Sequence, residues 1–173
     1  MNKAEMVTNV VIAGLGGQGV ISAANVLADA AVRTGYDVKQ SEIHGMSQRG
    51  GSVTSDVRFG PKVYSPMVPV GEADFVLVLH PSQQDNNRYH LKHGGCFLSI
   101  VQLLDGKEDL SVLDGNDTTP ITSRNSNIAM LGILSRRLQL PVENWESAIR
   151  AILPPNVHDQ NIQAFHFGRT QEE

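Results

Sequence analysis

The stretch "VTNVVIAGLGGQG", residues 7–19, constrains the fold of this chain more than any other. Residues 7–13 form an apolar, β-branched run that is typical of a buried strand, and a glycine-rich turn follows directly. A helix is predicted over residues 17–34, with Gly35 at the position of a C-terminal cap. A buried strand that turns sharply into a helix is the first unit of an α/β fold.

The remaining patterns predict a continuation of this alternation. Strands are expected at residues 36–43, 74–81 and 94–100, a strand or hairpin at 52–63, and a weak strand near Val112. Helices are expected from Pro81 to about Lys92 and over residues 127–138, 142–153 and 156–167. Residues 64–74 contain two prolines and are expected to form a surface loop. We therefore predict a single three-layer α/β/α domain over residues 1–173, with a Rossmann-like open sheet.

The first predicted helix has an unusually narrow polar face. Its polar residues follow one stripe, at Ser22, Asn25, Asp29 and Arg33, and nearly all others are aliphatic. Such a helix must be covered on more than its sheet side, either by another layer of this chain or by a second polypeptide. The loop "YSPMVPV" is the other candidate for contact with a partner subunit.

Composition excludes several classes of function. The formal net charge of −4 argues against a nucleic-acid partner, and no run of 18 apolar residues is present to span a membrane. The single cysteine, Cys96, rules out an internal disulfide and a cysteine-only metal cluster, and its apolar surroundings predict a buried, inert thiol. No signal-peptide pattern precedes the first strand. With a single cysteine that is not expected to form a disulfide, we expect a cytoplasmic protein. His80, His90 and His93 lack an evident further ligand, so no metal site is expected.

Two segments near the C-terminal half have simple structural interpretations. "SRN", residues 123–125, precedes a predicted helix and is interpreted as its cap, with an anion contact as the alternative. Trp145 shares an apolar helix face with Ala148, Ile149 and Ile152 and is expected in the core.

The glycine turn permits three interpretations. Gly14, Gly16 and Gly19 satisfy the G-x-G-x-x-G pattern of dinucleotide sites, and Glu42 is a possible ribose ligand. The backbone amides of such a turn also suit another phosphate or anion at the start of the helix. The third interpretation is a tight turn that only allows close packing.

A second polar segment, "EIHGMSQRGGSV", spans residues 42–53. Arg49 offers a planar donor for phosphate or carboxylate, Ser47 and Ser52 offer hydroxyls, and Gly50 and Gly51 allow backbone amides to face a ligand. Because loops after strands gather at the carboxyl edge of an open sheet, this loop is expected to adjoin the glycine turn. The alternative is a solvated turn in which His44 and Arg49 pair with local acids.

Several motifs together resemble a known family. They are "GLGGQGVISAANVLADAA", "SEIHGMSQRGGSVTSDVRFG", "VYSPMVPVGEADFVL", "SNIAMLGIL" and "NIQAFHFG", and they occur across residues 7–168 in the family's order. The chain thereby resembles the gamma-type subunits of the 2-oxoacid:ferredoxin oxidoreductases. The "HGMSQRGGSV" form is similar to the small (beta) subunit of the indolepyruvate branch.

The resemblance implies a subunit of a larger enzyme that oxidatively decarboxylates an aryl 2-oxoacid, forms the acyl-CoA and reduces ferredoxin. Thiamine diphosphate, magnesium and iron–sulfur clusters would belong to the large (alpha) subunit, and coenzyme A would be a co-substrate. This chain alone would bind none of these cofactors and would not be active alone.

The resemblance also assigns roles to the two loops, which would face the partner's active site. In the turn, the residues that match the family's site positions are Gly14, Gly16, Gly17, Gln18 and Gly19. In the loop, the matching residues are Glu42, His44, Gly45, Ser47, Gln48, Arg49, Gly50 and Gly51. The glycines, Gln18, Ser47 and Arg49 would hold a phosphate or thioester-proximal group, and His44 and Gln48 would donate hydrogen bonds into the active site.

Overall fold

A five-stranded mixed sheet forms the centre of the protein. The computed structural model describes residues 6–46 and 50–171, and in this part of the chain the strand order is β2-β3-β1-β4-β5. The strands are β1 (Thr8–Leu15), β2 (Asp37–His44), β3 (Ser52–Gly60), β4 (Ala73–Val78) and β5 (Leu91–Ser99). The α-helices are α1 (Val20–Arg33), α2 (Gln84–Asn87), α3 (Ser126–Ser135), α4 (Val142–Ile152) and α5 (His158–Thr170).

The sheet is parallel on one side of β1 and antiparallel on the other. β1, β4 and β5 run parallel, whereas β3 is antiparallel to both β1 and β2. The β2–β3 hairpin is therefore inserted beside β1, and Ser52 at the start of β3 pairs with Leu15 at the end of β1. This register brings the β2–β3 loop to the same edge of the sheet as the glycine turn.

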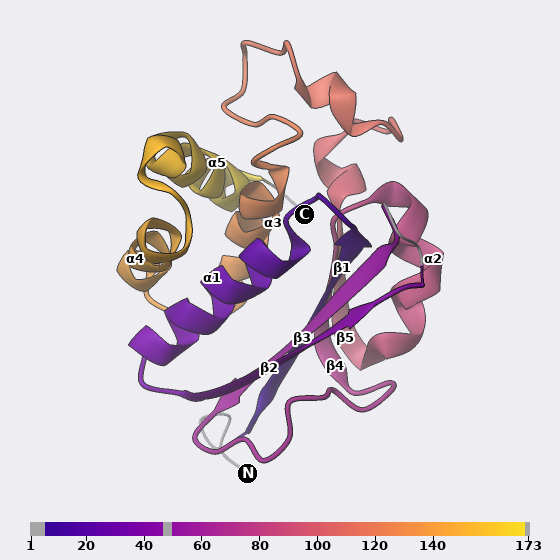
Figure 1. Cartoon of the computed structure of the whole chain (residues 1–173), viewed down its shortest axis with the longest axis vertical. Helices are drawn as coiled ribbons and strands as arrows, with labels where there is room; N and C mark the ends of the chain where they lie inside the picture. The colour runs from indigo at the N-terminus through magenta and orange to yellow at the C-terminus, as the bar shows by residue number, and fades with distance from the viewer. Residues whose placement is uncertain (1–5, 47–49, 172–173) are drawn as a thin grey trace.

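Four helices cover one face of the sheet (Figure 1). α1 and α3 contact the strands, while α4 packs on α1 and α5 packs on α3. The largest hydrophobic cluster lies between these layers and includes Val10, Ile12, Leu77 and the fully buried Trp145 and Phe165. The core position predicted for Trp145 is confirmed. The narrow polar face of α1 is explained by α4, a layer of the same chain.

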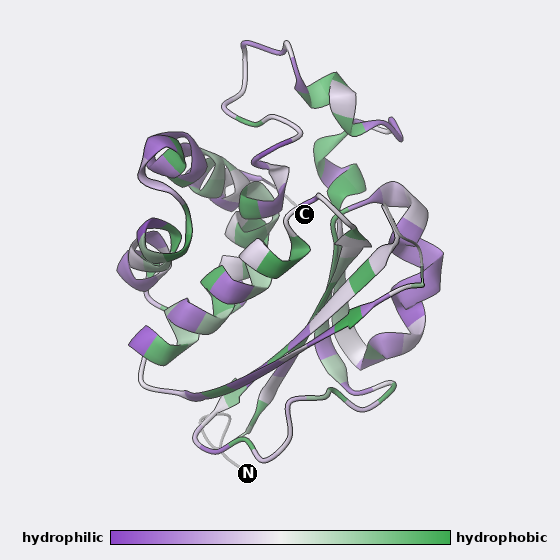
Figure 2. Ribbon diagram, viewed as in Figure 1, coloured by the Kyte–Doolittle hydropathy of each residue, from purple (hydrophilic) through white to green (hydrophobic). Residues whose placement is uncertain are grey.

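The opposite face has a thinner cover. A smaller cluster of Val11, Val76 and Val78 is closed by Val68 of the 61–72 loop, with Leu91 and Phe97 packed against it. The short helical segment 81–90, which includes α2, lies on this side and is largely hydrophilic in Figure 2. The α/β fold class with an open sheet is confirmed, although the third layer is a loop and short turns.

Two predicted elements differ in the structure. Val112 lies in a 3-10 turn (Leu110–Leu113), not in a strand; Asp109 accepts a hydrogen bond from the amide of Ser111 and so stabilises the turn. The predicted helix from Pro81 to Lys92 ends earlier, because Leu91 pairs with Ala73 and begins β5. The extra residues between Leu91 and Cys96 form an irregularity in that strand.

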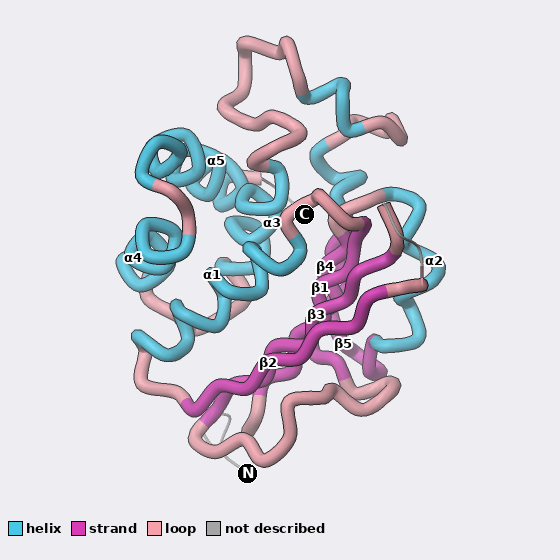
Figure 3. Tube along the Cα trace, in the orientation of Figure 1, coloured by secondary structure: helices cyan, strands magenta, loops and turns pink. Residues whose placement is uncertain are grey.

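The 104–125 segment has little regular structure and stands beyond the carboxyl ends of the parallel strands (Figure 3). It leads into α3, and its end lies beside the glycine turn. This placement makes the carboxyl edge of the sheet the most elaborated part of the molecule.

Candidate functional site

The glycine turn connects β1 to α1 through Gly16–Gly19. Gly17 and Gly19 have φ of 86° and 73°, in the left-handed region that favours glycine. The turn is closed by the amide of Gln18, which donates to the carbonyl of Leu15 at 3.2 Å. The side chain of Gln18 folds back as well, and its Oε1 accepts from the amide of Leu15 at 2.9 Å.

Close packing also selects glycine at two positions of the turn. A Cβ on Gly14 would lie 2.8 Å from Cγ2 of Val20, and a Cβ on Gly19 would overlap the side-chain nitrogen of Asn127. A Cβ on Gly17 would meet nothing within 4 Å. None of the described residues accepts a hydrogen bond from the amides of Gly17 and Gly19. The turn therefore combines a packed inner side with an open, donor-bearing outer side.

The polar loop lies directly against the turn. The amide of Gly16 donates to the carbonyl of Gly51 at 2.9 Å, and a Cβ on Gly16 would be in ordinary contact with the backbone of Gly50 and Gly51. Gly50 has φ of 65°, and the amide of Gly45 donates to the carbonyl of Ser52 at 2.7 Å. The expected contact of loop and turn is confirmed. It arises from the β2–β3 hairpin.

The other predicted loop residues have different outcomes. Ser47, Gln48 and Arg49 lie outside the described residues. His44 ends β2 with an exposed side chain, and its Nε2 lies 3.7 Å from Oε2 of Glu42. This pairing is the local arrangement expected for a solvated turn. β3 separates Glu42 from β1, so Glu42 does not occupy the place of a ribose ligand beside a Rossmann turn.

A cleft of about 510 Å³ opens beside the turn. Gly17, Gln18 and Gly19 form one wall together with Ser22 of α1. The other walls come from distant parts of the chain: Leu110, Ser123, Arg124, Asn125, Asn127, Ile128, Leu153, Val157, Gln160 and Asn161. The volume falls within the usual range for small-molecule sites. α1 and α3 both begin at this cleft, so both helix dipoles favour an anion there.

Sequence patterns indicated only part of this cleft. Of the residues in "SRN", Ser123 donates from its amide and hydroxyl to the carboxylate of Asp114, at 2.9 and 2.7 Å. These bonds lower the pKa of Asp114. Arg124 lines the cleft and Asn125 is the N-cap residue of α3 without a side-chain cap bond. Asn127 and Gln160 were not predicted as site residues, because their approach to the turn depends on the packing of α3 and α5.

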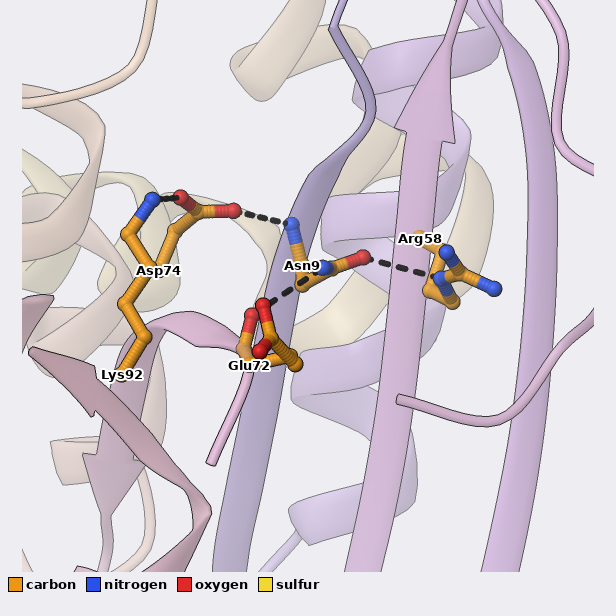
Figure 4. Close-up of polar contacts among 5 residues, drawn as sticks. All are labelled: Asn9, Arg58, Glu72, Asp74 and Lys92. Carbon is orange, nitrogen blue, oxygen red and sulfur yellow. Dashed lines mark hydrogen bonds and ion pairs between the residues drawn. The ribbon is translucent and has the colours of Figure 1, made fainter. Parts of the chain in front are cut away.

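The opposite end of the sheet contains a polar network with a structural role (Figure 4). The amide of Asn9 donates to Oδ2 of Asp74 at 2.8 Å, and its Nδ2 donates to the carbonyl of Glu72 at 3.0 Å. Nε of Arg58 donates to Oδ1 of Asn9 at 2.8 Å, and Lys92 pairs with the other oxygen of Asp74. These contacts join β1, β3 and β5 to the start of β4.

A second cavity, of about 460 Å³, lies at this end of the sheet. Tyr36, Phe59, Phe75 and Leu140 contribute apolar walls, and Cys96 also lines it. Cys96 packs against the main core cluster but is only half-buried, so the buried position predicted for its thiol is not fully reached.

A buried carboxyl, Asp56, lies against the 61–72 loop, and its charge interacts with the half-buried His90. Oδ2 of Asp56 accepts from the amide of Val68 at 2.8 Å, and burial raises the pKa of this carboxyl. Burial lowers the pKa of His90, an effect that the charge of Asp56 opposes. The described residues contain no group of three or more His, Cys, Asp or Glu side chains that could hold a metal.

Comparison with known proteins identifies the family. The model of the family described as pyruvate ferredoxin/flavodoxin oxidoreductase matches residues 9–171. The chain belongs to this family. It is 37% identical to the indolepyruvate oxidoreductase subunit IorB of Thermococcus kodakarensis, over 92% of this chain and 93% of that protein. The resemblance inferred from the sequence motifs is confirmed.

Solved structures share the fold. The gamma subunit of a keto/oxoacid ferredoxin oxidoreductase from Geobacter sulfurreducens has a TM-score of 0.73 and 26% identity, with 93% of this chain and 95% of that chain covered. The 2-oxoglutarate:ferredoxin oxidoreductase of Magnetococcus marinus, solved with 2-oxoglutarate, coenzyme A and succinyl-CoA bound, has a TM-score of 0.80 and 20% identity. That match covers 96% of this chain and 31% of the other. The relatives are subunits of oxidoreductases.

The described part of the chain contains no helix with both the length and the apolar character needed to cross a membrane.

Proposed function

We propose that this chain is the small subunit of a 2-oxoacid:ferredoxin oxidoreductase that acts on indolepyruvate or a related aryl 2-oxoacid. The large subunit would carry out the decarboxylation, and this chain would complete the site at which coenzyme A receives the acyl group. The activity of the complex would be the conversion of 2-oxoacid, coenzyme A and oxidised ferredoxin to acyl-CoA, carbon dioxide and reduced ferredoxin. Its single cysteine suits the reducing cytoplasm, where ferredoxin operates.

One observation carries this proposal. The glycine turn and the polar loop join through the hydrogen bond from Gly16 to Gly51, beside a cleft at which two helices begin. Backbone amides and helix N-termini suit the phosphate groups of coenzyme A, and Arg124 adds a cation. Gly45 and Gly50, between which Gln48 and Arg49 occur in the sequence, belong to the same edge, so these two residues are the loop side chains proposed for the shared site.

The metal-ligating residues of the chain indicate that the iron–sulfur clusters belong to the partner subunit. Iron–sulfur clusters require several cysteine thiolates, and this chain has Cys96 alone. Thiamine diphosphate and magnesium are assigned to the large subunit on the family resemblance alone. When bound there, thiamine diphosphate supplies the carbanion chemistry of decarboxylation. The residues of this chain bind and orient coenzyme A and exclude water from the shared site.

The test is reconstitution with a large subunit of the indolepyruvate type. Co-expression should give a stable complex that reduces methyl viologen with indolepyruvate and coenzyme A. Arg49→Ala should lower turnover while the complex still assembles. If the large subunit alone is equally active and does not co-purify with this chain, the proposal fails. Full activity of the Arg49→Ala complex would instead indicate a scaffold subunit.

A Rossmann-type nucleotide module is the second candidate, because Gly14, Gly16 and Gly19 fit the dinucleotide pattern. Thermal-shift titration with NAD, NADP and FAD separates it from the first candidate. A ligand at 100 times its Kd should stabilise the isolated chain by about 2.7 kcal/mol. The position of β3 between Glu42 and β1 argues for no shift.

A further inference from the structure

The glycine turn is held from outside by a residue of α3. Nδ2 of Asn127 donates to the carbonyl of Gly19 at 3.1 Å, across a sequence separation of 108 residues. The same carbonyl accepts from the amide of Ala23 at 2.9 Å, which is the first hydrogen bond of α1. Asn127 therefore contacts the last residue of the turn at the point where the helix begins.

Both ends of the Asn127 amide are engaged. Oδ1 accepts from the amide of Ile128 at 2.9 Å, so the side chain is fixed relative to its own helix. The residue is buried, with 6% of its surface exposed. Its Nδ2 occupies the space that a Cβ on Gly19 would need. A buried amide with both ends paired has one favoured orientation, and it transmits that orientation to its partner.

Gln18 holds the other side of the turn. Its Oε1 accepts from the amide of Leu15, within the turn itself. Two amide side chains thus fix the backbone of residues 15–19, one from inside the turn and one from α3. Gly17 and Gly19, whose amides have no acceptor among the described residues, line the cleft between these two points.

We propose that Asn127 is a positioning residue for coenzyme A: by holding the carbonyl of Gly19 it aligns the amides of the glycine turn with the phosphate groups. This inference rests on the proposed function of the turn. Asn127 itself acts through Gly19. It also links the turn to α3, so the two walls of the cleft keep a constant separation.

The experiment measures KM for coenzyme A, KM for indolepyruvate and kcat in the reconstituted complex. Asn127→Ala should raise KM for coenzyme A about five- to ten-fold. The kcat at saturating coenzyme A and KM for indolepyruvate should stay within about two-fold, because the role proposed for Asn127 concerns the binding of coenzyme A alone. Asn127→Asp keeps the shape and loses the donor, so it should raise KM for coenzyme A at least as much.

A matched control lies at the other end of α1. Nδ2 of Asn144 donates to Oγ1 of Thr34 at 3.2 Å, so Asn144→Ala also removes one asparagine hydrogen bond to this helix. KM for coenzyme A should be unchanged in this variant. If Asn127→Ala fails to assemble, Asn127→Ser leaves a smaller void and permits the same comparison.

The outcomes separate this inference from the proposed function. Gln18→Glu places a negative charge in the turn and should raise KM for coenzyme A if the turn binds it. If Gln18→Glu raises KM and Asn127→Ala and Asn127→Asp do not, the positioning role is wrong while the proposed function holds. If none of these variants changes KM for coenzyme A, the turn is not the coenzyme A site and both ideas are overturned. A similar rise in Asn144→Ala would indicate a general effect of α1 stability.

Discussion

Gly168 of α5 lies directly against Ala129 of α3, and a Cβ on residue 168 would overlap the carbonyl oxygen of Ala129. Gly132 of α3 lies in the same relation to the carbonyl of Phe165. The two helix backbones therefore touch without side chains between them. Because α3 also supplies Asn127, this contact helps to determine where the far wall of the cleft stands.

Gly168→Ala should destabilise the isolated chain by about 3 kcal/mol, because the new methyl group can be accommodated only if the helices separate. Urea unfolding measures the free energy difference. Gly35→Ala is the control: Gly35 has φ of 98° but open space around it, so only backbone strain of about 1–2 kcal/mol is expected. Equal losses in both variants would contradict a steric role for Gly168.

Arg58→Ala should loosen the 61–72 loop. Besides contacting Asn9, Arg58 donates from Nη1 to the carbonyls of Ser65 and Met67, at 2.8 and 3.3 Å. Losing these bonds should cost about 1–2 kcal/mol and should speed hydrogen exchange at residues 63–68. Arg136→Ala, which removes a single bond to the carbonyl of Gln171, serves as the control. Unchanged exchange in Arg58→Ala would show that other contacts hold the loop, such as the hydrogen bonds from the amides of Val63 and Val68 to Asp37 and Asp56.

His90 should make stability depend on pH. Its folded-state pKa lies below the usual 6.5 because the ring is partly buried, so the unfolded chain binds the proton more readily. Neutral His90 therefore adds to the free energy of unfolding above pH 6.5. This stabilisation is lost as the pH falls through 6.5 toward the folded-state pKa of His90. The free energy of unfolding should thus fall between pH 7.5 and about 5.5. His90→Gln should reduce this slope, and His80, whose pKa is also lowered by burial, should account for part of the remainder. The exposed His93 provides the control variant His93→Gln, which should keep the wild-type slope.

Gln18→Glu should change the charge of the glycine turn without changing its structure. A carboxylate oxygen can still accept from the amide of Leu15, so the turn should keep its shape. The added negative charge should raise KM for coenzyme A by about ten-fold at low ionic strength, and less at 0.5 M salt because the repulsion is screened. A salt-independent rise would indicate that the turn itself had changed. Melting temperatures of the two isolated proteins check its integrity.

Local patterns predicted the elements around the site well. The strand, the glycine turn and α1 follow from an apolar run, four glycines and a helical periodicity that ends at Gly35. The motifs of the turn and loop also indicated the family correctly. Prediction was poorer where short-range interactions compete, as at Val112, where the side chain of Asp109 favours a 3-10 turn over a strand.

The sequence by itself determined that a donor-rich glycine turn and a polar glycine loop would lie at one edge of an α/β sheet, because both features depend on neighbouring residues. Only the tertiary structure decided that β3 would stand between β1 and β2, which separates Glu42 from the turn. It also placed Asn127 on Gly19, although 108 residues lie between them. Contacts of this kind depend on how α3 and α5 pack, and no local periodicity encodes that packing.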